Sequence, residues 1–147
     1  MSISLILLAL TLGAIISIYL PMISQTARIL GDAPLANVPF FGIAFVASII
    51  IAAASGTRLS DYGKVMAIPP VLLTAGIMSA GLIIGSSYLV PRIGIGAFFV
   101  LLVAGQVLAA MVFGQLGLFG APVTSLTFGK VAGAVLVVAG VWLVTYR

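Results

Sequence analysis

Long stretches without any charged residue constrain this chain more than any other feature. The sequence has 147 residues but only eight charged side chains, six Lys or Arg and two Asp. About 18 or more apolar residues in a row indicate a membrane-spanning helix, because about 20 residues at 1.5 Å rise cross a hydrocarbon core of about 30 Å. The chain is therefore predicted to be an integral membrane protein. Its uncharged stretches cover residues 1–27, 33–57, 65–91, 93–129 and 131–146.

The composition supports the bilayer as the solvent for most of the surface. Charged residues make up 5% of the chain, against about 25% in soluble domains. The basic residues are scattered, so the clustered positive charge that nucleic-acid binding needs is absent. Cys and His are absent too, which removes disulfides, the usual transition-metal ligands and the commonest general base. We therefore expect no enzyme activity, no metal and no cofactor.

Hydropathy and breaking residues predict one membrane domain, residues 1–147, with five spanning helices. The turn residues of 55–64, the pair Pro91-Arg92, and Gly117 with Pro122 mark boundaries. Because the connections are short, consecutive helices should be antiparallel neighbours. The predicted fold class is all-α, as a multi-pass protein of the cell's inner membrane. The helices are expected at about 3–24, 38–54, 65–88, 93–115 and 125–146.

The basic residues favour neither orientation in the membrane. Lys and Arg in short loops set orientation, and five helices place the N-terminus on the same side as the 2–3 and 4–5 loops. This balance predicts insertion in both orientations, so that an antiparallel homodimer would form a ten-helix inverted repeat. A single orientation set by the insertion machinery or by a partner chain is the alternative. The basic residues are Arg58, Lys64 and Lys130 on the N-terminal side, and Arg28, Arg92 and Arg147 on the other.

A pattern of glycines around one glutamine, together with the exit of the first helix, resembles a known family. The matching segments are Val103-Ala104-Gly105-Gln106-Val107-Leu108, Gly117-Leu118-Phe119-Gly120, Gly133 with Ala139-Gly140-Val141, Ser24-Gln25, and Val38-Pro39-Phe40-Phe41-Gly42. They resemble the YdcZ-like branch of the drug/metabolite transporter superfamily over essentially the whole chain.

The resemblance implies a five-helix protein that works as a pair and is half of a ten-helix transporter. The pair can be a homodimer, a heterodimer of homologous chains or two fused halves. The superfamily moves small organic molecules, although the branch itself implies no particular substrate. Members often carry an acidic residue just before the Gly-Leu-Phe-Gly segment, where this chain has Gly114. Any function of that carboxylate in relatives is missing here.

Gln106 is the first candidate for a substrate-binding residue. It lies near the middle of the predicted fourth helix among apolar neighbours. An unpaired amide in hydrocarbon costs several kcal/mol, so the side chain must face protein or a water-filled cavity. It either binds a substrate in a central pocket or joins two helices by a hydrogen bond of about 0.6 kcal/mol.

The end of the first helix is the second candidate region. Pro21 has no N–H, so the carbonyl of Ser17 loses its intrahelical donor, and broken helices with free carbonyls often form transporter sites. Tyr19, Ser24 and Gln25 lie nearby in the sequence. The alternative is that Pro21 only sets the end of the helix.

Small residues recur on the predicted third and fifth helices. Gly81 and Gly85 form one GxxxG pair, Gly129 and Gly133 form another, and Gly140 shares a helix face with Gly133. Small residues let helix backbones approach closely in lipid. We expect them to pack helices within or between chains. In the four-helix small multidrug resistance relatives of this family the last helix forms the dimer contact, so the resemblance implies a dimer contact on the fifth helix here.

The predicted function is transport of a small neutral, zwitterionic or amphipathic organic molecule by alternating access in an antiparallel dimer. Asp32 and Asp61 both fall in predicted loops, so no span offers a carboxylate for proton-coupled antiport. The alternative is a non-transporting membrane subunit that assembles with, or regulates, a partner membrane protein.

Overall fold

A computed structural model describes residues 3–118 and 122–146, and these residues are mostly helical. Within them, five helices are long and apolar enough to cross a membrane, which confirms the predicted all-α, multi-pass fold class. The chain divides into two compact units, Met1–Pro91 and Arg92–Arg147. The elements are α1 (Ile3–Leu30), α2 (Ala33–Ala54), the 3-10 helix η1 (Leu59–Ala67), α3 (Pro70–Ile93), α4 (Ile95–Leu116) and α5 (Phe128–Tyr146).

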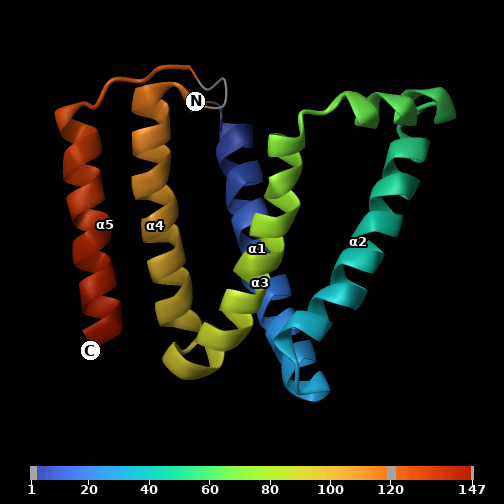
Figure 1. Ribbon diagram of the computed structural model, residues 1–147. Coiled ribbons are helices and arrows are strands. Elements are labelled where there is room, and N and C mark those ends of the chain that lie inside the picture. Colours follow the sequence, from blue (N-terminus) through green and yellow to red (C-terminus); the bar gives the residue numbers. More distant parts are fainter. Residues whose placement is uncertain (1–2, 119–121, 147) are drawn as a thin grey trace. The chain divides into compact units, whose positions relative to one another are not determined.

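The first unit is built on an antiparallel hairpin of α1 and α2 (Figure 1). Gly31 turns the chain with a φ of +70°, which glycine adopts without strain. Asp32 then caps α2 by accepting a hydrogen bond from the Leu35 N–H at 2.9 Å, and Pro34 stands in the first turn, where no N–H is needed. The sequence predicted the first two helices at about 3–24 and 38–54; the structure corrects these bounds, because α1 continues to Leu30, α2 begins at Ala33, and a glycine and a cap suffice to join the helices.

Pro21 lies inside α1 and does not end it. The interpretation that Pro21 only sets the helix end is therefore wrong. With 28 residues, α1 is about 42 Å long and exceeds a hydrocarbon core of about 30 Å. A helix of this length tilts in the bilayer or extends beyond it.

The start of α3 is delayed by two prolines. Ile68 precedes Pro69 and adopts extended backbone, with φ −72° and ψ 126°, as residues before proline generally do. Pro70 begins the helix, where its missing N–H has no partner to lose. The expected start at residue 65 is therefore corrected to residue 70, and residues 65–67 belong to η1.

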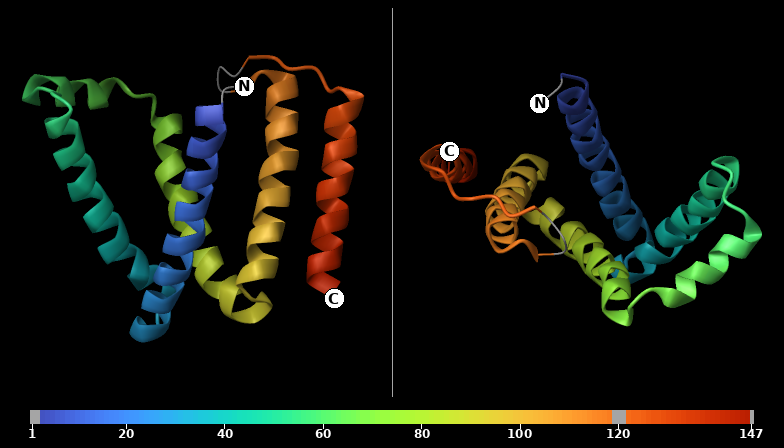
Figure 2. Two further views of the ribbon diagram at one scale, coloured as in Figure 1. Left: turned by 180° about the vertical axis from the view of Figure 1, so that it is seen from behind. Right: turned by 90° about the horizontal axis from the view of Figure 1, so that it is seen from above.

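The second unit contains α4 and α5, which run antiparallel and side by side (Figures 1 and 2). Their connection folds back onto the end of α4. The Thr124 N–H donates to the Gly114 carbonyl at 2.9 Å, and the Leu126 N–H donates to Gln115 Oε1 at 2.9 Å. These bonds hold the connection against the end of α4, and α5 begins at residue 128 rather than 125. Residues 119–121, with Phe119 and Gly120 of the Gly-Leu-Phe-Gly segment, lie outside the described residues.

Most apolar side chains on the helices are exposed in the single chain, and α5 has no buried residue. Such exposure is compatible with a bilayer, because lipid tails are as apolar as these side chains. Acyl chains or further protein chains must therefore cover these faces. The buried apolar residues of the first unit come from α1, α2 and α3, and they are Leu20, Ile23, Ala27, Ala36, Ile83 and Val90.

Candidate functional site

Four buried polar side chains distinguish the first unit from the rest of the described chain. They are Ser24 of α1, Asn37 of α2, and Ser86 and Ser87 of α3. Ser86 Oγ donates to the Ile83 carbonyl at 2.8 Å, the ordinary bond of a serine to its own helix. Three spanning helices therefore contribute polar groups that are hidden from the bilayer.

Asn37 has an unused hydrogen-bond acceptor. Its Nδ2 donates to the Ala80 carbonyl of α3 at 3.2 Å, which ties α2 to α3. Its Oδ1 is buried and has no partner among the described residues. Leaving such a group unpaired costs about 1–3 kcal/mol, and buried polar atoms without a protein partner usually bind water or a ligand.

Ser87 has a second unused group. Its side chain is buried, and its Oγ finds no partner in the described part of the chain. Ala80, which accepts from Asn37, and Ser87 are seven residues apart, so they lie on the same side of α3 about 10 Å apart along its axis. The face of α3 that receives Asn37 thus carries a second hydrogen-bonding point about two helical turns away.

An aromatic cleft of about 260 Å³ lies between α1 and α2. The rings of Tyr19 and Phe40 stack there, with centroids 5.8 Å apart and planes inclined by 18°. Pro39 and Ile43 line the cleft on the side of α2. This surface can hold an apolar or aromatic group of modest size.

The candidates predicted on α1 are dispersed by the structure. Tyr19 lines the aromatic cleft, and Pro21 lies two residues further along the helix without lining it. Ser17 Oγ donates to the Gly13 carbonyl at 3.2 Å, so the serine bonds to its own helix. Gln25 is exposed. Of the four residues, Tyr19 is the one that lines the cleft between α1 and α2.

Gln106 is exposed on α4, and its side-chain amide has no hydrogen-bond partner among the described residues. In hydrocarbon this amide would be costly, so a group outside its own unit, or water, must satisfy it. The proposed roles in substrate binding and in helix association both remain predictions.

Within the described chain, no neighbouring helix lies close to the glycines that were singled out for packing. A Cβ added at any of them would meet no atom within 4 Å. The expected packing of these positions, within or between chains, therefore stays a prediction. They are Gly81 and Gly85 on α3, and Gly129, Gly133 and Gly140 on α5.

Sequence reasoning missed Asn37, because it placed the start of α2 at Val38. The signal was present as Asp32 followed by Pro34, the pattern of a helix cap and first turn. A helix started at this cap would have placed Asn37 inside the predicted membrane span. Ser87 gave no signal, since a serine in a helix usually bonds to the preceding turn.

Both carboxylates lie outside the spanning helices. Asp32 caps α2, and Asp61 accepts from Lys64 Nζ at 2.6 Å and from the Arg58 N–H at 3.1 Å within η1. The Lys64 ammonium, with a further contribution from the Arg58 N–H, lowers the pKa of Asp61 below its usual 3.8. In the described residues, no group of three or more His, Cys, Asp or Glu side chains could hold a metal ion.

Comparison with known families decides the class of protein. The family described as "Putative inner membrane exporter, YdcZ" matches residues 4–143. The chain belongs to this family. Membership in the YdcZ family confirms the resemblance drawn from the glycine pattern, and it makes the chain a multi-pass inner-membrane protein of a transporter family. No curated protein and no solved structure gives a significant match.

Proposed function

We propose that the chain exports a small neutral, zwitterionic or amphipathic organic molecule by alternating access in an antiparallel dimer. The observation that carries this proposal is the pair of buried, unpaired atoms, Asn37 Oδ1 and Ser87 Oγ. A purely structural interior would pair both atoms, because each unpaired group lowers stability by about 1–3 kcal/mol. Sites at which buried polar atoms stay unpaired are commonly functional.

The chemistry of the two groups suggests the substrate class. Asn37 Oδ1 accepts a hydrogen bond, whereas Ser87 Oγ both donates and accepts. A hydroxyl or amide group of a ligand can pair with either atom, and neither atom needs a charged partner. The aromatic cleft beside Tyr19 and Phe40 offers a surface for an apolar portion. Since the described spans contain no carboxylate, proton antiport through a buried acid is not expected, and the same absence argues against catalysis.

Two observations favour a dimer. The Gln106 side chain has no hydrogen-bond partner in its own unit, and a Cβ added at Gly81 or Gly85 of α3 would meet nothing within 4 Å. An amide and small residues are the features that join membrane helices of different chains. The even division of basic residues between the two sides of the membrane favours an antiparallel arrangement.

Comparative mass spectrometry of culture media tests the proposal. Cells that overproduce the chain should release one or more small organic compounds above the level of an empty-vector strain. Asn37→Ala and Ser87→Ala should each lower the excess by about tenfold, because one hydrogen bond in a buried site contributes on the order of 1.4 kcal/mol.

Ser48→Ala is the matched control. Ser48 is exposed on α2, and its Oγ donates to the Ala44 carbonyl at 2.7 Å. This substitution should leave release unchanged. If overproduction changes no compound in the medium, the export proposal fails and a non-transporting subunit becomes the better description. If release persists in Asn37→Ala and Ser87→Ala at normal protein levels, the site is wrong.

A further inference from the structure

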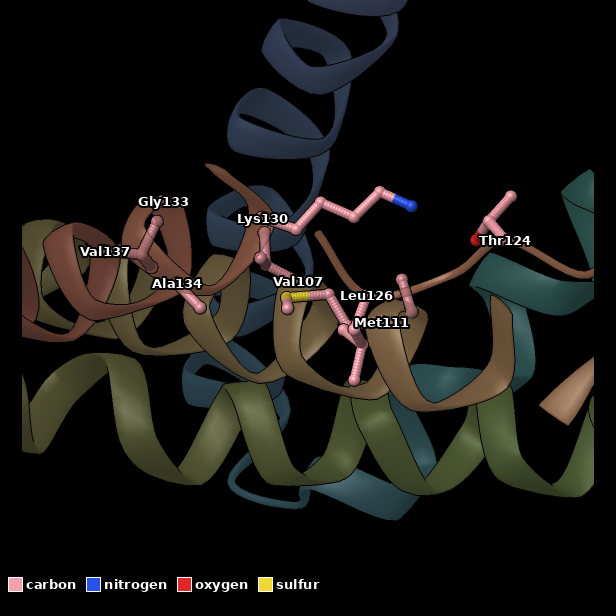
Figure 3. A pocket seen from close by; sticks show the side chains of 9 residues that line it. Val107, Met111, Thr124, Leu126, Lys130, Gly133, Ala134 and Val137 are labelled. Carbon is pink, nitrogen blue, oxygen red and sulfur yellow. The ribbon is translucent and has the colours of Figure 1, made fainter. Parts of the chain in front are cut away.

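A groove between α4 and α5 has two polar residues and is otherwise apolar. Its volume is about 480 Å³, within the range of roughly 300–1,000 Å³ typical of ligand sites. The walls are apolar apart from Thr124 and Lys130, and Figure 3 shows the Lys130 side chain extending toward the side on which Thr124 lies. A second apolar hollow of about 410 Å³ shares Val137 and continues past Gly140 to Val144. One face of α5 therefore borders a groove from its first turn to its last.

The charge of Lys130 is not neutralised within its own unit. Its Nζ donates to the Ser125 carbonyl at 2.9 Å, which is a neutral partner. Residues 92–147 contain no Asp or Glu, so no carboxylate of the unit can pair with it. Lys64 differs, because Asp61 lies 2.6 Å from its Nζ. An anion from outside the chain would neutralise the charge of Lys130.

The position of Lys130 in its helix strengthens this argument. A cation in the first turn of α5 stands at the positive end of the helix dipole, which is unfavourable by about 0.3–1 kcal/mol. The charge therefore does not serve to stabilise the helix. An anion beside Lys130 would be attracted by the ammonium and by the helix end together.

Polarity changes with depth along the groove as it does along a phospholipid. Lys130 is the third residue of a spanning helix, at the level where basic residues meet headgroups. Val137 lies seven residues further on, about 10 Å deeper in the hydrocarbon, and the lining there is apolar. We propose that this groove binds an anionic membrane phospholipid, with its phosphate at Lys130 and Thr124 and one acyl chain lying along Val137 toward Val144.

Native mass spectrometry of the full chain, released from detergent, tests the proposal. The probes are phosphatidylglycerol and phosphatidylcholine with identical acyl chains, and inorganic phosphate as a competitor. The wild type should retain phosphatidylglycerol in preference to phosphatidylcholine, and phosphate should not displace it. Lys130→Gln should weaken phosphatidylglycerol binding about fivefold, because one Lys near an anionic lipid contributes about 1 kcal/mol. Lys130→Arg should retain it.

A second variant probes the apolar part of the groove. Ala134 lines it, so Ala134→Leu should reduce retention of both lipids. Two controls should behave as the wild type: Lys64→Gln removes an equal charge from the ion pair with Asp61, and Ala139→Leu enlarges an exposed α5 residue outside the groove.

Three results would overturn the lipid site. One is equal phosphatidylglycerol retention by Lys130→Gln, Lys64→Gln and the wild type. The second is displacement of the lipid by inorganic phosphate, which would identify a site for small anions. The third is loss of a dimer mass in Ala134→Leu with lipid retention intact, which would assign the groove to a helix of a second copy.

Discussion

Gly114 has only a hydrogen atom as its side chain, and this lets the α4–α5 connection pack closely against α4. A Cβ at Gly114 would lie 2.8 Å from Thr124 Oγ1, closer than real contacts of this type. The Thr124 N–H bonds to the carbonyl of the same glycine at 2.9 Å. At the position where the resemblance implies an acidic residue in relatives, the Thr124 side chain occupies the space next to the glycine, so a larger residue would have to displace it.

Gly114→Ala is expected to destabilise the second unit by about 1–3 kcal/mol, because overpacking forces the Thr124 side chain or the loop to move. The unfolding of the purified protein in detergent, followed by circular dichroism, measures this. Thr124→Ala in the same chain should restore much of the loss, since it removes the Oγ1 that the new methyl group meets.

Gly105→Ala is the matched control for this contact. Gly105 lies on the same helix, and a Cβ there meets nothing within 4 Å. It should be neutral or stabilising by up to about 1 kcal/mol through helix propensity. Equal stabilities of Gly114→Ala and Gly105→Ala would show that the loop does not press on residue 114.

Among the elements, η1 depends on a carboxylate outside the membrane. Asp61 holds the N-terminal end of η1 by its bonds to the Arg58 N–H and Lys64 Nζ. Because its pKa is lowered in the folded chain, this contribution is complete above the usual value of 3.8 and is lost as the pH falls through the lower folded pKa. Its magnitude should shrink in high salt, since the pair is exposed.

Titration of the Asp61 carboxyl carbon by NMR in detergent micelles checks this behaviour. The midpoint should lie below 3.8 in the wild type and should move up toward 3.8 in Lys64→Gln, because the first cause of the shift is removed. Thr57→Ala, near the loop but without a bond to Asp61, is the control and should keep the wild-type midpoint. A wild-type midpoint at or above 3.8 would contradict the role of Lys64.

The spans were predictable from sequence, whereas their ends were not. Uncharged runs locate helices because hydrocarbon excludes charge, and this signal survives any detail of packing. Helix ends depend on local backbone geometry, such as the extended Ile68 before Pro69 and the positive φ of Gly31. Of the candidate site, Tyr19 was found because it lies two residues before Pro21 in the sequence. The unpaired state of Ser87 depends on tertiary contacts that no short pattern encodes.

For the whole molecule, the balance of basic residues predicts that the chain inserts in both orientations. Two reporters fused after Arg147, one active only in the cytoplasm and one only outside, should both be active in the same cells. A single active reporter would contradict dual insertion and would require an oppositely oriented partner for the proposed dimer.

Added lysines sharpen this test. Ser60→Lys adds a charge to the side of Arg58 and Lys64, whereas Ile29→Lys adds one to the side of Arg28. Both positions are exposed. The two variants should shift the ratio of reporter activities in opposite directions, because short-loop lysines hold their loop in the cytoplasm. If neither added lysine changes the ratio of reporter activities, orientation is not set by this charge balance.

The turn between α1 and α2 consists of Gly31 and Asp32 alone. Once both helices have been synthesised, they reach the insertion machinery as a helical hairpin whose turn adds very few polar groups. Arg28 and Asp32 near the tip sum to zero charge, so the membrane potential does no net work on the tip as it crosses. The membrane potential therefore favours neither side of the membrane for this turn.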